Sequence, residues 1–349
     1  AGYGSPDTTA NANLVIAGVG NQTVTGGSGS DVVRINNGEW DAGDTFTGGA
    51  GYDAVQFDLN GSAGGVNSLV ATIDLSTVTS VELFQSFGSG DRIPATPGNP
   101  NVDADTYTVT FQNGNIGTLT QLKLDNSSMN DAADTMRFIL NAGDADYAFN
   151  IFGAAAGTTF VDKVNVGINN NINFQGSTGV DILRISGGDL GSTTIFNGGA
   201  GMMDAIVQNG GQITDDDYFQ VTNVEILTAA NVVNAVLGAA ASASGLNTIQ
   251  GTANNDNVLF DPAFTGNVDI TLSGGDDTFN AAGASGTFTY NEDLTNIDAN
   301  DTIIGGANGA DTFNINAVGG GAADLTNVDG IEVYNITADG GDSVTLTLG

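Results

Sequence analysis

The chain has 349 residues, of which 40 are acidic and 6 are basic, so its formal net charge is −34 at pH 7. Such an acidic surface repels phosphate groups and anionic lipid, which argues against nucleic-acid binding. The chain contains neither histidine nor cysteine, which excludes a Ser-His-Asp triad, a cysteine nucleophile and a histidine-ligated zinc site. We therefore expect no enzymatic activity. No apolar run approaches the roughly 20 residues of a transmembrane helix, so no membrane insertion is expected.

The acidic residues are 35 aspartates and only 5 glutamates, and the chain also holds 52 glycines. Aspartate and glycine favour turns, whereas glutamate favours helices. Hydrophobic residues make up 40% of the chain and include 17 phenylalanines, which is enough for a packed core. The composition predicts an all-β protein rich in loops.

A glycine-aspartate phrase, Gly-Gly-x-Gly-x-Asp followed by an apolar residue, recurs along the chain. Its best copies are 26–33 and 48–55, which are 22 residues apart, and looser copies lie at 176–183, 198–206, 251–258, 274–279 and 305–313. Calcium takes six to eight oxygen ligands at about 2.3–2.6 Å, and a tight glycine turn can aim carbonyl and carboxylate oxygens at such an ion. The alternative for any loose copy is a strand-connecting turn without metal.

The phrase predicts several isolated calcium loops, because no two copies are adjacent. The candidate metal ligands are Gly27, Gly29, Asp31, Gly49, Gly51, Asp53, Gly179, Asp181, Asp204, Asp256, Asp276, Asp277 and Asp311.

A larger repeat ends in an apolar phrase whose second residue is a glutamate. These phrases contain Glu82, Glu225 and Glu332; Glu225 and Glu332 each follow the aspartate of the preceding loop by 21 residues, and Glu82 follows by 29. A spacing of 21–22 residues suits one coil of a parallel β-helix. The predicted fold is therefore a β-solenoid resembling a β-helix, or a set of stacked β-sandwich modules, with glycine-aspartate calcium loops.

Four segments are predicted. They are a calcium-loop module at 12–90, a proline-rich linker with a β insertion or subdomain at 91–170, and further calcium-loop modules at 171–245 and 246–349.

Within these segments, three prolines make 91–105 the best candidate for a linker, and 104–170 lacks the glycine-aspartate phrase. Alternation with period two predicts strands at 106–111 and 343–348. The alanine-rich stretch 231–243 predicts a short helix.

The glycine-aspartate phrases resemble those of the RTX family of type I-secreted bacterial proteins, and the phrases with glutamate resemble modules of surface-layer and matrix proteins. This resemblance implies a calcium-binding β fold and a secreted protein at the bacterial cell surface or in the extracellular matrix. It also implies a structural role, in which the chain assembles with copies of itself into a surface layer, sheet or filament.

Calcium would make that assembly possible by neutralising the facing acidic surfaces. Cell-surface polysaccharide is a further expected partner. Two alternatives stay open, namely a calcium-stabilised adhesin or ligand-binding module of a larger secreted protein, and the targeting tail of a secreted hydrolase.

Overall fold

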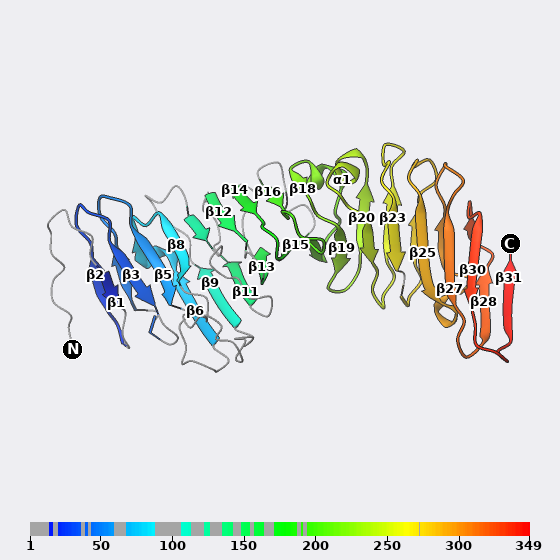
Figure 1. The fold of residues 1–349 in the computed structure, drawn as a ribbon, viewed down its shortest axis with the longest axis horizontal. Helices are drawn as coiled ribbons and strands as arrows, with labels where there is room; N and C mark the ends of the chain where they lie inside the picture. The colour runs from blue at the N-terminus through cyan, green and yellow to red at the C-terminus, as the bar shows by residue number, and fades with distance from the viewer. Residues whose placement is uncertain are drawn as a thin grey trace, which may run out of the picture. The chain divides into compact units, whose positions relative to one another are not determined.

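Short parallel strands stacked in register build the fold, which the computed structural model shows to be a β-solenoid (Figure 1). The structure describes residues 14–16, 20–35, 39–40, 43–58, 68–87, 106–112, 122–125, 135–141, 148–153, 157–163, 171–186, 190, 194–271 and 273–349. The chain divides into unit 1, residues 1–183 with 193–201, and unit 2, residues 184–192 with 202–349.

Unit 1 contains three stacks of parallel strands. The first holds β1 (Leu14–Ile16), β3 (Val32–Ile35), β5 (Ala54–Asp58), β8 (Leu83–Phe87), β10 (Leu122–Asp125), β12 (Ala148–Phe152), β14 (Asn171–Gln175) and β16 (Thr194–Asn197). The second holds β6 (Ser68–Asp74), β9 (Thr106–Gln112), β11 (Thr135–Asn141) and β13 (Thr158–Lys163). The third holds β2 (Thr23–Thr25), β4 (Thr45–Thr47) and β7 (Val78–Thr79), the last preceded by the 3-10 turn η1 (Leu75–Thr77). Strand β15 (Val180–Ser186) crosses the boundary between the units.

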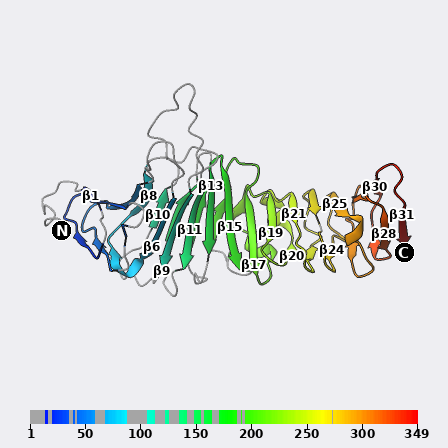
Figure 2. The same ribbon diagram turned by 90° about the horizontal axis from the view of Figure 1, so that it is seen from below.

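Unit 2 also contains three stacks of parallel strands. The first holds β17 (Ala205–Gly210), β19 (Ile226–Ala229), β21 (Thr248–Gln250), β23 (Val268–Thr271), β25 (Phe288–Asp293), β27 (Thr312–Asn316) and β30 (Val333–Thr337). The second holds β20 (Asn234–Leu237), β22 (Asn257–Phe260), β24 (Thr278–Asn280), β26 (Thr302–Ile304) and β29 (Val328–Asp329). The third pairs β28 (Gly321–Leu325) with β31 (Val344–Leu348). Figure 2 shows β21 and β25 on one side of this unit and β20 and β24 on the other.

Four short elements complete unit 2. They are η2 (Asp215–Tyr218), β18 (Val221–Thr222), α1 (Ala239–Ala243) and η3 (Leu294–Asn296). Among the described residues, no helix is long and apolar enough to span a membrane.

Each coil adds one rung to the sheets, so inward side chains stack into ladders. Val258, Phe279 and Ile303 are register partners on β22, β24 and β26, and all three side chains are fully buried. Neighbouring strands are about 4.8 Å apart. Burying one such side chain contributes about 1.5–3 kcal/mol to stability, and the ladder repeats that contribution at every coil.

The coil length agrees with the sequence-based expectation. Hydrogen bonds between neighbouring rungs join residues that are 22 apart where the Thr228 hydroxyl donates to the main-chain carbonyl of Gln250, and 21 apart where the Asn335 amide donates to Asn314 Oδ1. The β-solenoid prediction is confirmed.

Two predicted strands are present, as β9 and β31, whereas the helix predicted at 231–243 is shorter than expected. Residues 234–237 form β20 because they pair in register with β22. Helix α1 starts only after Gly238, where the Asp215 carboxylate accepts the main-chain N–H groups of Gly238, Ala240 and Ala241. Sheet pairing overrides the helix propensity of Ala235 and Leu237, whereas the alanines after Gly238 do form the helix.

The described strands within 104–170 continue the solenoid. Strand β9 pairs in register with β6, and β10 pairs with β8, so this segment shares both of its sheets with the coils before it. The proline-rich stretch 91–105 lies outside the described residues. The four predicted segment boundaries stay a prediction.

Candidate functional site

The predicted aspartate ligands occupy a common place in the coil. Six of them lie buried immediately before a strand: Asp31, Asp53, Asp204, Asp256, Asp277 and Asp311. Asp181 is also buried but lies within β15, and Asp276 is exposed one residue before Asp277. The parallel strands of one stack start at the same edge, so these carboxylates lie above one another as columns along that edge.

In unit 1 the column runs from Asp31 through Asp53 to Glu82. The main-chain N–H of Asp31 donates to Asp53 Oδ1 at 2.7 Å, and the N–H of Asp53 donates to Glu82 Oε2 at 2.7 Å. Asp31 Oδ2 in turn accepts from the N–H of Gly27 in its own loop, also at 2.7 Å. Each carboxylate thus serves as the acceptor for a buried N–H that precedes the strand of the neighbouring coil.

The second stack of unit 2 repeats this arrangement over four successive coils. The N–H of Val233 donates to Asp256 Oδ1 at 2.6 Å, that of Asp256 to Asp277 Oδ1 at 2.8 Å, and that of Asp277 to Asp301 Oδ1 at 2.9 Å. The second oxygen of Asp256 accepts from the N–H of Thr252 at 2.6 Å. Every carboxylate of this column therefore ties one coil to the next.

The first stack of unit 2 makes the same bonds. The N–H of Asp204 donates to Glu225 Oε2 at 3.1 Å, and that of Asp311 donates to Glu332 Oε2 at 2.8 Å. Asp311 Oδ1 accepts from the N–H of Phe288 at 2.7 Å.

The three repeated glutamates therefore share one structural role. Each accepts from the N–H of the aspartate on the preceding coil, and its own N–H donates back to the carbonyl of that aspartate. Two positions before each glutamate, the backbone has a positive φ, at Ser80 (54°), Asn223 (52°) and Gly330 (66°). The sequence showed the phrase, but its role in closing a column becomes visible only in the structure.

The glycines of the phrase are required by close stacking of the coils. A Cβ on Gly26, Gly48, Gly176 or Gly305 would overlap a carbonyl oxygen of the next coil. Such a Cβ would also press on the carboxylate of the same phrase.

The glycines predicted as ligands lie within the same stack. A Cβ on Gly49 would overlap the Gly27 carbonyl oxygen, and one on Gly51 would overlap that of Gly29. Gly49 and Gly51 also have φ values of 108° and 143°. Gly179 is buried two residues before Asp181.

Burial sets the protonation of the columns. Desolvation raises the pKa of Asp256 and Asp301, and it raises the pKa of Asp277 to about 7, although the N–H of Asp256 opposes that shift. The pKa of Asp53 is raised for the same reason. Asp53 Oδ2 is buried without a hydrogen-bond partner among the described residues, which favours the protonated form.

The donor set of the columns does not fit calcium. A calcium ion needs six to eight oxygens directed at one point, whereas at least one oxygen of each column carboxylate accepts a main-chain N–H group, whose positive end repels a cation. Over the described residues, no group of three or more acidic side chains is placed to hold a metal ion. Calcium binding elsewhere on this acidic chain stays a prediction.

Two column members were missed by the sequence analysis. Asp44 Oδ1 accepts from the N–H of Gln22 at 2.6 Å, and Asp301 ends the longest column of unit 2. Neither lies in a glycine-aspartate phrase. Both immediately precede a strand whose second residue is apolar, and that signal would have identified them.

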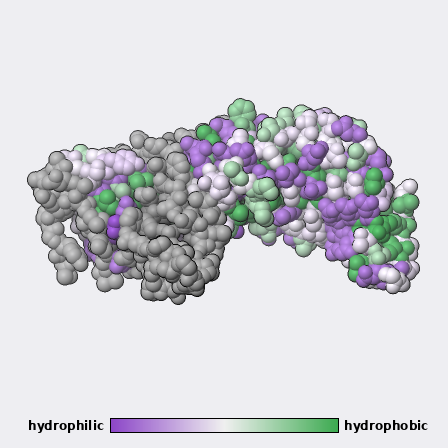
Figure 3. All heavy atoms as spheres, viewed as in Figure 1, coloured by the Kyte–Doolittle hydropathy of each residue, from purple (hydrophilic) through white to green (hydrophobic). Residues whose placement is uncertain are grey.

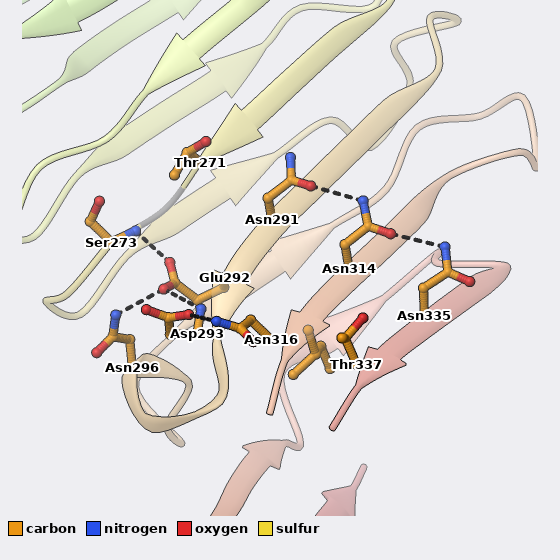
Figure 4. A pocket seen from close by; sticks show the side chains of 11 residues that line it. Thr271, Ser273, Asn291, Glu292, Asp293, Asn296, Asn314, Asn316, Asn335 and Thr337 are labelled. Atoms are coloured by element: carbon orange, nitrogen blue, oxygen red, sulfur yellow. Dashed lines mark hydrogen bonds between the residues drawn. The ribbon is translucent and has the colours of Figure 1, made fainter. Parts of the chain in front are cut away.

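A second polar feature is a shallow groove of about 580 Å³ on unit 2. Figure 4 shows a ladder of amides along it, in which Asn314 donates to Asn291 Oδ1 at 2.8 Å and Asn335 donates to Asn314 Oδ1 at 2.9 Å. Glu292 is buried at the lower end, where its carboxylate accepts from the main-chain N–H groups of Ser273 and Asp293 and from the Asn296 amide. Burial raises the pKa of Glu292.

Comparison with protein-family models, with curated proteins and with solved structures finds no match for the chain.

Proposed function

We propose that the chain is an extracellular structural subunit that assembles with copies of itself through the outer edge of the coil formed by β30 and β31. The proposal assigns it no catalytic role. It rests on one observation, which is that β30 repeats the apolar pattern of the inner rungs of unit 2, while no strand among the described residues covers its outer side.

The apolar side chains of β30 illustrate the uncovered ladder. Tyr334 and Ile336 are the register partners of Phe313 and Ile315, whose side chains are buried. Tyr334 is nevertheless 39% exposed and Ile336 44% exposed. Figure 3 shows hydrophobic surface gathered over this coil. A further rung with the same pattern would bury these side chains as each inner rung does.

Unpaired backbone groups and the amide ladder also support assembly at this edge. Among the described residues β30 pairs only with β27, and β31 only with β28, so each has one edge of unpaired N–H and C=O groups. Asn335 Oδ1 accepts no hydrogen bond from the described residues, although the equivalent oxygens of Asn291 and Asn314 do. An exposed edge of this kind is a template for strand addition from another chain.

Charge opposes such assembly and makes it dependent on cations. Copies that each carry −34 repel one another unless ions screen or neutralise them. The resemblance to secreted surface-layer proteins supports an extracellular location, where calcium is available as that ion.

The test is the size of the chain in solution. We expect the wild type to form assemblies in millimolar calcium, measured by sedimentation velocity and electron microscopy, and Ile336→Asp to stay monomeric because it places a charge on the exposed rung. Met202→Asp is the matched control, since Met202 is 85% exposed but lies away from β30. A wild type that is monomeric throughout, or an Ile336→Asp variant that assembles normally, would contradict the proposal.

The amide groove favours a second candidate, a ligand-binding or adhesin module. Amide, hydroxyl and carboxylate groups along a groove suit a polyhydroxylated ligand such as cell-surface polysaccharide. This candidate requires a monomer that binds a glycan and loses binding in Asn314→Ala. Glycan binding without self-association would support it over the structural subunit.

A further inference from the structure

We infer that the glycine-aspartate loops of this chain hold neighbouring coils together without metal, because their buried carboxylates accept hydrogen bonds from main-chain N–H groups of the adjacent coil. The inference is independent of the proposed assembly, since it concerns what stabilises a single chain.

The first step is the direction of the bonds. A carboxylate that binds calcium presents its oxygens to a cation, whereas Asp256, Asp277 and Asp301 each accept an N–H from the preceding coil at 2.6–2.9 Å. A charge-assisted bond to a main-chain N–H is among the stronger hydrogen bonds in proteins. The lone pairs that accept these N–H groups are not available to a cation.

The second step is that the bond does not depend on the calcium-like phrase. Asp44 and Asp301 make it from loops without the Gly-Gly pair, and Glu82, Glu225 and Glu332 make it with a longer side chain. The feature common to all of these positions is an acceptor for a buried N–H.

The third step explains the glycines. In four copies of the phrase the first glycine lies against a carbonyl oxygen of the next coil and against the aspartate of the same copy, so a side chain there would separate the coils; these glycines are Gly26, Gly48, Gly176 and Gly305. Close stacking of the coils therefore explains the first glycine in these copies without a metal ion. It follows that the coils form at any calcium concentration.

The experiment compares two adjacent aspartates in the full chain. Asp277 is buried in the column, while Asp276 is exposed. Among the described residues, the Asp276 carboxylate accepts from the side-chain amides of Asn255 and Asn300, and its N–H donates to Asn255 Oδ1. Both belong to the same predicted calcium loop. Asp277→Asn, Asp276→Asn and the wild type are melted with chelator, with calcium, and with magnesium at the same concentration.

Magnesium controls for general screening of the negative charge. At pH 8, where the Asp277 carboxyl is ionised, we expect Asp277→Asn to melt several degrees below the wild type by the same amount in all three solutions, because the amide replaces a charged acceptor with a neutral one and adds a donor. Asp276→Asn should melt close to the wild type throughout.

Two results would overturn the inference. One is a deficit of Asp277→Asn that appears with calcium and disappears with chelator. The other is observed with the wild type alone: loss of its β-sheet circular dichroism signal in chelator at room temperature. Retention of that signal supports the inference even if Asp277→Asn fails to fold.

Discussion

Gly305→Ala should destabilise the chain by about 3 kcal/mol or more, the upper range for forcing an extra methyl group into a packed interior. The added Cβ would overlap the carbonyl oxygen of Gly330 on the next coil and lie 2.7 Å from Asp311 Oδ2. The Gly330 oxygen cannot rotate away because it belongs to the backbone. The Asp311 carboxylate is held at both oxygens, since Oδ2 accepts the N–H of Gly306 at 2.5 Å and Oδ1 accepts the N–H of Phe288 at 2.7 Å. Thermal unfolding followed by circular dichroism measures the loss.

Gly274→Ala is the matched control, since Gly274 is also the first glycine of its phrase. A Cβ on Gly274 would have no heavy atom within 4 Å, and its φ is not in the positive region. Alanine there should leave the melting temperature unchanged or raise it slightly, because it reduces the entropy of the unfolded chain. Equal effects at the two glycines would show that the coils stack less closely at Gly305 than the structure has it.

The solenoid could be predicted from the sequence because the length of one coil equals the spacing at which the same residue types recur. Aspartate and glycine recur every 21–22 residues where a strand must start, and the apolar residues that follow them stack into the core. These features depend only on neighbouring positions along the chain, so spacing was sufficient to find them.

The role of the carboxylates was not predictable in the same way. Which oxygen faces which donor depends on the register between coils, as in the bond from Asp53 N–H to Glu82 over 29 residues. The same Gly-Gly-x-Gly-x-Asp phrase suits a cation and a main-chain N–H equally, because both require a carboxylate at a tight turn. Only the position of the neighbouring coil distinguishes the two.

The exposure of the apolar side chains of β30 was also not predictable from the sequence. The residues 333–337 have the same alternation as inner strands such as β27 and would be assigned to the core. Their exposure is seen only in the structure, where β30 pairs with β27 and with no other described strand.

Acidification from pH 8 to pH 5 should increase the free energy of unfolding, the opposite of ordinary acid denaturation. The folded-state pKa of Asp277 is about 7, raised from 3.8 mainly by burial. A carboxyl with a raised folded-state pKa contributes stability that is complete below the unfolded pKa and is lost as pH rises through the folded pKa. The window for Asp277 therefore runs from about pH 4 to about pH 7, with a slope of at most about 1.4 kcal/mol per pH unit for this one proton.

Protonation is compatible with the column. One oxygen of Asp277 continues to accept the N–H of Asp256 while the other carries the proton, and the repulsion from Asp256, Asp301 and Glu292 is relieved. Burial raises the pKa of those three groups as well, so their titration changes stability in the same direction as that of Asp277.

Urea unfolding at several pH values between 5 and 8 measures the effect, in the Ile336→Asp background so that assembly does not contribute. Asp277→Asn should flatten the pH dependence, because the amide does not titrate, whereas Asp276→Asn should keep it. A free energy of unfolding that falls steadily from pH 8 to pH 5 would mean that the column carboxylates are ionised in the folded chain. Their hydrogen bonds to main-chain N–H groups would then outweigh the cost of burial, and the coils would be held by a column of charges.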